Sequence, residues 1–245
     1  MNTPNAALRD AIEQAYAAFS KVSPPLELEA SPLRNARQIL AALSAAPLRE
    51  LTEEQIGPYS GWAITTVGND RDYRHFLPRI FELSVTNPVW LGAEPPVMAS
   101  KLNMARWREW PDSQQKAVLR FFRAAFDWVV QQHPESGWSA ALWACGLATL
   151  GEDASAIFDR LYSTSSPLAA LQLASFIMDE AKRLRRHGEV RTSFWDDVDP
   201  EARRRIADFL TSDQSTAFLH AAASRVSDED RLFLDAAITE LQMQG

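Results

Sequence analysis

The densest group of reactive side chains in the chain lies between residues 68 and 79. It holds two carboxylates, Asp70 and Asp72, one imidazole, His75, and three guanidinium groups, among them Arg74. Asp72 and His75 are three residues apart, so a helix would place both on the same side. An acid and a base placed in this way could move a proton while Arg74 or Arg79 holds an anion. The segment is therefore a candidate active site.

The same segment also suits a structural role. Asn69, Asp70 and Asp72 are favoured at the start of a helix, because they accept free backbone N–H groups and complement the helix dipole. His75 would then cap or pack beside the bend that Pro78 introduces. No second histidine lies nearby, no His-x₃-His spacing occurs, and Cys145 is the single cysteine. The sequence therefore predicts neither a metal site nor a cofactor.

A second candidate covers residues 106–110, where Trp107 and Trp110 alternate with arginine and glutamate. Tryptophan and arginine are enriched among the residues that anchor protein interfaces. The alternative is that both rings pack onto the next helix through the tight turn at Pro111. We predict that Trp107 and Trp110 are partner-binding residues.

Three segments in the middle third of the chain resemble a family of all-helical bacterial proteins. They are YSGWAITTVG from Tyr59, DYRHFLPRIFEL from Asp72 and KLNMARWREWP from Lys101. In that family, a Thr-Thr-x-Gly turn precedes an Arg-His-Phe-Leu-Pro-Arg segment, and a Trp-x-x-Trp-Pro segment follows. The resemblance spans roughly residues 51–130. It implies a helical fold and no particular activity.

Basic side chains gather at residues 182–187 and 203–205, where they could form a patch for phosphate or RNA. However, cations are also favoured in the last turn of a helix, and Asp179 lies four residues before Arg183. Acidic residues, among them Asp196, Asp197, Asp199 and Glu201, lie between the two clusters, and the formal net charge is -7. We therefore expect an ion-paired surface and no nucleic-acid binding.

The elements that must position these residues are helical throughout, since apolar residues recur at three- and four-residue steps. We predict an all-α fold of about ten helices, either an irregular right-handed, HEAT-like array or an irregular bundle. No period of 35 to 45 residues is present. Residues 1–245 are expected to form one domain, from which the proline pair Pro24-Pro25 detaches at most an N-terminal helix and loop over 1–25. The predicted helices cover about 5–20, 32–46, 58–66, 69–83, 96–110, 113–132, 138–150, 153–161, 167–187, 200–210, 213–225 and 227–243.

Composition and the absence of common motifs restrict the classes of function that the sequence favours. The chain has 245 residues, 46% of them hydrophobic, and lacks a secretory leader, a long apolar stretch and the common catalytic motifs. These observations favour a non-enzymatic cytoplasmic protein that binds another protein, a basic one in view of the acidity. One such role is that of an immunity or antitoxin-type protein that neutralises a toxin by occlusion. The alternative is an enzyme with its site around Asp72 and His75; no catalytic residue is assigned and no membrane contact is expected. The predicted partner-binding residues are Asp70, Asp72, Arg74, His75, Trp107 and Trp110.

Overall fold

The computed structural model describes residues 3–88, 90 and 92–243, and it is all-α in this part of the chain. Twelve α-helices and five short 3₁₀ helices form among these residues. The only extended pairing among them consists of two isolated β-bridges, Ala30 with Val67 and Ala63 with Val67. The all-α prediction is therefore confirmed.

The chain forms two compact units, Met1–Ala125 (unit 1) and Phe126–Gly245 (unit 2). Each unit has its own buried core, and each is described below by itself. The expectation of a single domain over 1–245 stays a prediction.

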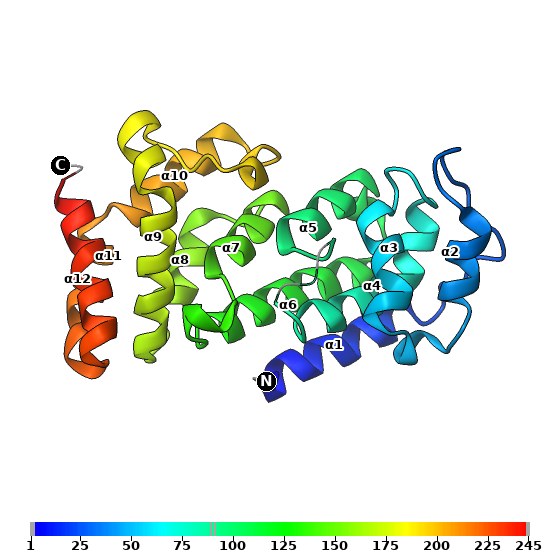
Figure 1. The fold of residues 1–245 in the computed structure, drawn as a ribbon, viewed down its shortest axis with the longest axis horizontal. Coiled ribbons are helices and arrows are strands. Elements are labelled where there is room, and N and C mark those ends of the chain that lie inside the picture. The colour runs from blue at the N-terminus through cyan, green and yellow to red at the C-terminus, as the bar shows by residue number, and fades with distance from the viewer. Residues whose placement is uncertain (1–2, 89, 91, 244–245) are drawn as a thin grey trace. The chain divides into compact units, whose positions relative to one another are not determined.

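Unit 1 is built around α4, the helix that carries most of the predicted site (Figure 1). Helix α1 packs along α4, and α2 packs on α3. The core includes Phe81 of α4 and Phe121 of α6, whose stacked rings have centroids 4.1 Å apart. The helices of this unit are α1 (Ala6–Phe19), α2 (Ala36–Leu43), α3 (Glu53–Trp62), α4 (Asp70–Ser84), α5 (Pro95–Met104) and the first part of α6 (Asp112–Val129), with η1 (Leu48–Glu50) and η2 (Trp107–Glu109) between them.

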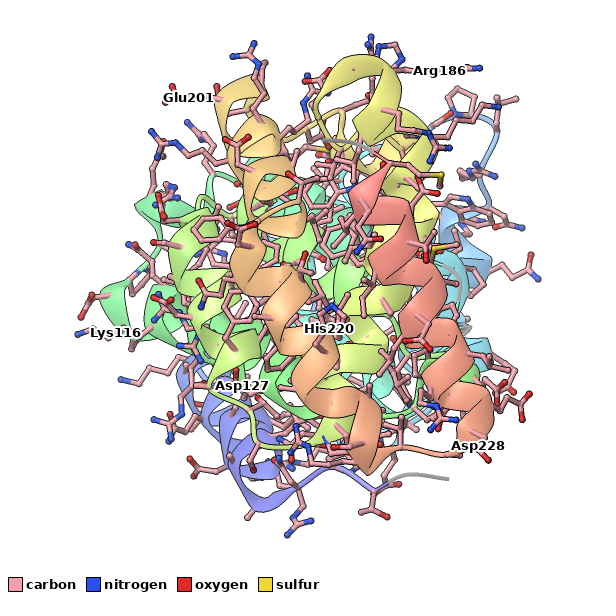
Figure 2. All side chains as sticks on the ribbon, turned by 90° about the vertical axis from the view of Figure 1, so that its left-hand side faces the viewer. Lys116, Asp127, Arg186, Glu201, His220 and Asp228 are labelled. Carbon is pink, nitrogen blue, oxygen red and sulfur yellow. The ribbon has the colours of Figure 1, made fainter. Side chains whose placement is uncertain are left out.

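Unit 2 is organised around α9, its longest helix. Helices α7, α10, α11 and α12 all pack on α9, and α11 and α12 lie side by side (Figure 2). Gln172, in the middle of α9, is buried and joins three backbone groups, because its amide donates to Gln132 and Trp138 and accepts from Ala140. The helices are α7 (Ala140–Thr149), α8 (Ala154–Tyr162), α9 (Pro167–His187), α10 (Pro200–Leu210), α11 (Asp213–Ala222) and α12 (Asp228–Gln242), with η3 (Pro134–Ser136), η4 (Ser193–Trp195) and η5 (Ala223–Arg225).

Most helix starts follow from local sequence. Polar side chains such as Asn5, Ser139 and Ser227 accept a backbone N–H from the first turn of the helix that follows, which satisfies a group that would otherwise lack a partner. The helix predicted over 58–66 is wrong in its bounds. The capping box between Thr52 and Gln55 starts α3 at Glu53, so Pro58 lies inside that helix.

Candidate functional site

The start of α4 uses Asp72 for capping. The Asn69 side chain accepts the backbone N–H of Asp72, and the Asp72 carboxylate accepts the backbone N–H of Asn69 at 3.1 Å. Asp72 is buried, and this burial raises the pKa of its carboxyl, while the Asn69 bond acts in the opposite direction. Gly68 makes the arrangement possible, since its φ of +66° suits glycine and a Cβ there would lie 2.9 Å from an Asp72 carboxylate oxygen.

Asp70 and Arg74 remain at the surface of α4 and bond to each other. The Arg74 guanidinium lies 3.3 Å from the Asp70 carboxylate, one helical turn away. The same guanidinium lies 5.4 Å from the ring centroid of Trp110, within the range of a cation–π contact. The structure therefore brings together residues of the two segments that the sequence singled out separately.

The two predicted interface tryptophans are buried within unit 1. Trp107 is 1% exposed and its indole N–H donates to Asn103, whereas Trp110 is 5% exposed and donates to the Ala105 carbonyl. The helix predicted over 96–110 ends instead at Met104, and the chain turns at Arg106, whose φ is +51°. In this conformation both rings pack inside the unit, and the use of Trp107 and Trp110 in partner binding stays a prediction.

His75 is half-buried and is fixed by the loop before it. Its Nδ1 lies 2.8 Å from the carbonyl of Val22. Because a carbonyl oxygen only accepts, Nδ1 is the donor in this contact. His75 lines a mainly apolar cavity of about 400 Å³ together with Pro24, Pro25, Phe76 and the leucines of α2 and η1.

Asp72 lines a different cavity, of about 520 Å³, together with Arg71 and the stretch from Ser23 to Glu27. The two groups of the predicted acid–base pair therefore face different cavities. Arg79, the other predicted anion holder, donates to the Leu51 carbonyl and to Glu82. Neither of these two cavities therefore gathers Asp72, His75 and Arg79 in one wall, although the cavities share Pro24, Pro25 and Leu26.

The loop over residues 20–35 covers this end of α4, and sequence analysis missed its importance. Glu29 accepts the N–H of Gly68 at 2.7 Å, and Ser31 donates to Thr66 at 2.9 Å. On this tethered loop, Leu26 is 90% exposed and Leu33 is 89% exposed.

The helix predicted over 32–46 wrongly placed Leu33 on an apolar helical face. Asn35 caps α2, which begins at Ala36, so Leu33 lies outside the helix. Asparagine just before an apolar periodic run is a start signal, and it could have located this boundary. The name loop site is used below for residues 20–35 together with the exposed Asp70 and the half-buried Arg74 of α4.

Lys101 supports the loop site from inside unit 1. Its ammonium group is buried and donates to the carbonyls of Gly61 and Ala63, at 3.1 and 2.8 Å, where α3 ends. Burial lowers the pKa of Lys101 to about 8. The next turn includes Ile64 with a φ of +67°, an uncommon conformation for a β-branched residue. Lys101 thus fixes the start of the turn that follows α3. Thr66 and Gly68, at the end of this turn, form the backbone hydrogen bonds to the loop.

Four arginines of the basic clusters of unit 2 form ion pairs. Arg183 lies 3.9 Å from Glu180, Arg203 lies 3.6 Å from Glu189, and Arg205 contacts both Asp153 and Glu201. Arg185 is bound to Glu240. These pairs agree with the surface expected from the sequence.

Net charge is divided unevenly between the two units. Unit 1 contains 14 Lys and Arg against 13 Asp and Glu, a net charge of +1. Unit 2 contains 11 against 19, a net charge of -8. The acidity of the chain is therefore a property of unit 2.

Within the described residues, no group of three or more His, Cys, Asp or Glu side chains could hold a metal ion. Cys145 is buried, its thiol donates to the Phe194 carbonyl, and burial raises its pKa to about 12. Among the helices of the described part, none combines the length and the apolar character that crossing a bilayer requires.

Comparison with known proteins identifies no relative of this chain. No family model matches the chain, and neither a curated protein nor a solved structure is similar to it. The resemblance to a family of helical bacterial proteins stays a prediction.

Proposed function

We propose that this chain is a protein-binding module that occludes a partner protein through the loop site. The observation that carries the proposal is the near-complete exposure of two leucines, Leu26 and Leu33, on one loop that backbone hydrogen bonds hold in place. Single exposed apolar residues are common on any surface. Two large ones on a tethered loop beside an apolar cavity offer a ready apolar anchor.

The charged residues around the leucines are of both signs. Glu27 and Glu29 are exposed on the same loop, and Asp70 lies at the exposed start of α4. Lys21, Arg34 and Arg74 of the loop site balance these three carboxylates. The partner that we propose therefore offers an apolar pocket with charges of both signs at its rim. Because the loop is already held by Thr66 and Gly68, binding would cost little ordering entropy.

Within this class we propose a cytoplasmic immunity or antitoxin-type role, in which the bound partner is a toxin whose working surface is covered. The support is the combination of the exposed apolar anchor with a candidate acid–base pair whose members line two different cavities. An enzyme built around Asp72 and His75 is not favoured by any observation of the site.

The experiment is capture of the tagged chain from its own host under mild salt, with a matched set of variants. We expect one partner at near-equal stoichiometry with the wild type and its loss with Leu26→Ser/Leu33→Ser. Leu232→Ser is the control, since Leu232 is 70% exposed on α12 of unit 2. Retention of the partner by the double variant would refute the loop site. For the toxin role, the captured partner should arrest growth alone, and the wild type but not the double variant should restore it.

A further inference from the structure

The loop site has a projecting leucine and an apolar cavity next to each other. Leu26 is 90% exposed, so it does not fill the cavity of about 400 Å³ whose wall it shares. Leu43, Leu51 and Phe76 also line this cavity, and all three are buried, which makes its inner wall apolar. Apolar cavities of roughly 150 Å³ hold a molecule of the size of benzene. The cavity therefore has room for a leucine side chain.

The projecting leucine is held in position from both sides. The carbonyl of Val22 accepts a hydrogen bond from His75 Nδ1 at 2.8 Å, and the carbonyl of Glu29 accepts the backbone N–H of Gly68 at 2.7 Å. Between these two hydrogen bonds, the proline pair of the loop restricts the backbone further. Because the leucine is already positioned, its insertion into a cavity would cost little ordering entropy.

A surface with both a projection and a matching cavity can bind a second copy of itself. A two-fold axis that runs midway between the two features brings the projection of each copy over the cavity of the other copy. Such an interface uses the same surface on both subunits and closes after two of them.

The charges of the loop site are also compatible with its own copy. It contains three cations and three carboxylates, namely Lys21, Arg34, Arg74, Glu27, Glu29 and Asp70. A surface with equal numbers of both signs can pair with itself, whereas a surface of one sign would repel its copy. Unit 1 as a whole has a net charge of +1, so two copies that meet through this unit repel each other weakly.

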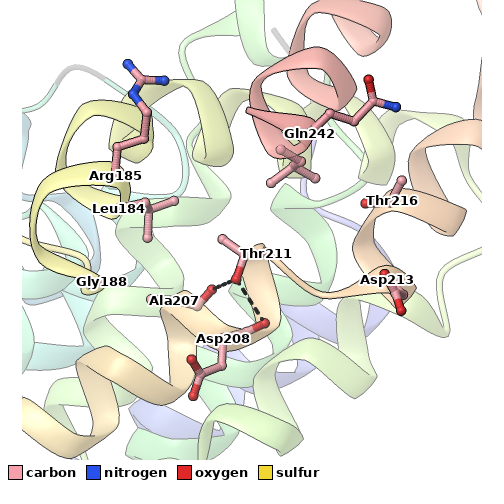
Figure 3. Close-up of a pocket in the computed structure, with 10 residues that line it drawn as sticks. Leu184, Arg185, Gly188, Ala207, Asp208, Thr211, Asp213, Thr216 and Gln242 are labelled. Carbon is pink, nitrogen blue, oxygen red and sulfur yellow. Dashed lines mark hydrogen bonds between the residues drawn. The ribbon is translucent and has the colours of Figure 1, made fainter. Parts of the chain in front are cut away.

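The larger cavity of unit 2 lacks this combination. It measures about 550 Å³, and Figure 3 shows that Asp208 on its wall turns away from Thr216 and Gln242. The hydroxyl of Thr211 donates to the Ala207 carbonyl at the end of α10. None of the large apolar side chains that are exposed in the described part of the chain lies on this wall. A projecting apolar side chain is therefore not a general property of the cavities of this chain.

We propose that two copies of this chain associate through the loop site, with Leu26 of each copy inserted into the apolar cavity of the other. One loop and one cavity per copy form a small interface, so the dimer is weak and reversible. For its role, the inference rests on the proposed function: the dimer covers the loop site, and a partner protein must displace the second copy to bind there. Self-association then keeps the apolar anchor out of nonspecific contacts until the partner is present.

The test is sedimentation velocity of the purified full-length chain between about 1 μM and about 1 mM. We expect an equilibrium between monomer and dimer without larger species. Leu26→Ser should weaken the dimer about a hundredfold, since each dimer loses two inserted leucines at about tenfold each. The control is Leu232→Ser, which removes a leucine that is 70% exposed on α12 and should leave the dimer unchanged.

A second variant blocks the cavity and keeps the leucine. Ser44 is exposed and lines the cavity, so Ser44→Trp should fill it without disturbing the core, and circular dichroism should show unchanged helix content. Its control is Ser224→Trp, at an exposed position of η5. In a mixture of the Leu26→Ser and Ser44→Trp chains, Leu26 of the second chain can enter the open cavity of the first. The mixed dimer regains one of the two contacts and should form about tenfold more tightly than either variant alone.

Three results would overturn the proposal: a monomer at all concentrations, equal weakening by Leu26→Ser and Leu232→Ser, or a mixture that associates no better than the single variants. These measurements use the purified chain alone, so their failure is separate from that of the proposed function. A monomeric chain that still captures a partner through Leu26 and Leu33 would refute the dimer only. A dimer with these properties that captures no partner would support the self-association and refute the proposed function.

Discussion

The buried ammonium of Lys101 makes stability depend on pH in a direction that is unusual for a lysine. Burial lowers the pKa of Lys101 to about 8, against an ordinary value near 10.5 in the unfolded chain. Between these values the unfolded chain binds one more proton than the native chain, so the free energy of unfolding rises with pH. The gain begins near pH 8 and is complete above about pH 10.5. The substitution Lys101→Met isolates the contribution of this ammonium group to the pH dependence of stability.

The magnitude follows from the size of the shift. At about 1.4 kcal/mol per pH unit, the interval from about pH 8 to about pH 9.5 corresponds to roughly 2 kcal/mol. Residual solvation and the bonds to Gly61 and Ala63 compensate part of the burial, so we expect about 1 kcal/mol. This is the extra stability that the wild type should gain over Lys101→Met between about pH 7 and about pH 9.5.

The assay is urea unfolding at both pH values, followed by helical circular dichroism. Comparing the two chains cancels the titration of every other group, including the buried tyrosines. Lys116→Met is the control, because Lys116 is exposed and pairs with Asp112 on the surface of α6. If the wild type and Lys101→Met change in parallel between the two pH values, then the bonds to the carbonyls offset the burial and the pKa argument fails.

Two further predictions concern packing in unit 1. Gly68→Ala should destabilise the chain by about 1–3 kcal/mol, because alanine is strained at positive φ and its Cβ meets Asp72. Gly61→Ala, which has open space around the added Cβ, should be neutral or stabilising, and equal thermal shifts for the two variants would contradict this explanation. Phe81→Ala should cost about 3–5 kcal/mol in chemical denaturation, since its ring is buried and stacked on Phe121; a loss below about 1 kcal/mol would show that the core is not organised around this pair.

The helix starts could be predicted from sequence because caps are local interactions. Asn69 and Asp72 act within four residues, and the pair Ser166-Pro167 begins α9 where the sequence placed it. Boundaries decided by competing signals were less predictable. At Pro58, the proline suggested a new helix, whereas the capping box of Thr52 and Gln55 had already begun one at Glu53.

The candidate site was less predictable, because burial depends on distant segments. Trp107 and Trp110 have the sequence context of interface anchors, yet the turn at Arg106 places both rings inside unit 1. Leu33 appeared apolar and helical but is exposed, since α2 starts only after Asn35. Periodicity identifies which residues share a face, but it does not say whether another element covers that face.

The unequal charges of the two units have a kinetic consequence. Association driven by opposite charge slows steeply as ionic strength rises, whereas association through a nearly neutral surface changes little. A ligand that reaches the chain at unit 2, with its charge of -8, should therefore show an on-rate that falls with salt. A partner that meets unit 1 at Leu26 and Leu33 should show a nearly constant on-rate and a salt effect confined to dissociation. The salt dependence of the two rate constants would thus reveal which unit makes the first encounter, before any complex is solved.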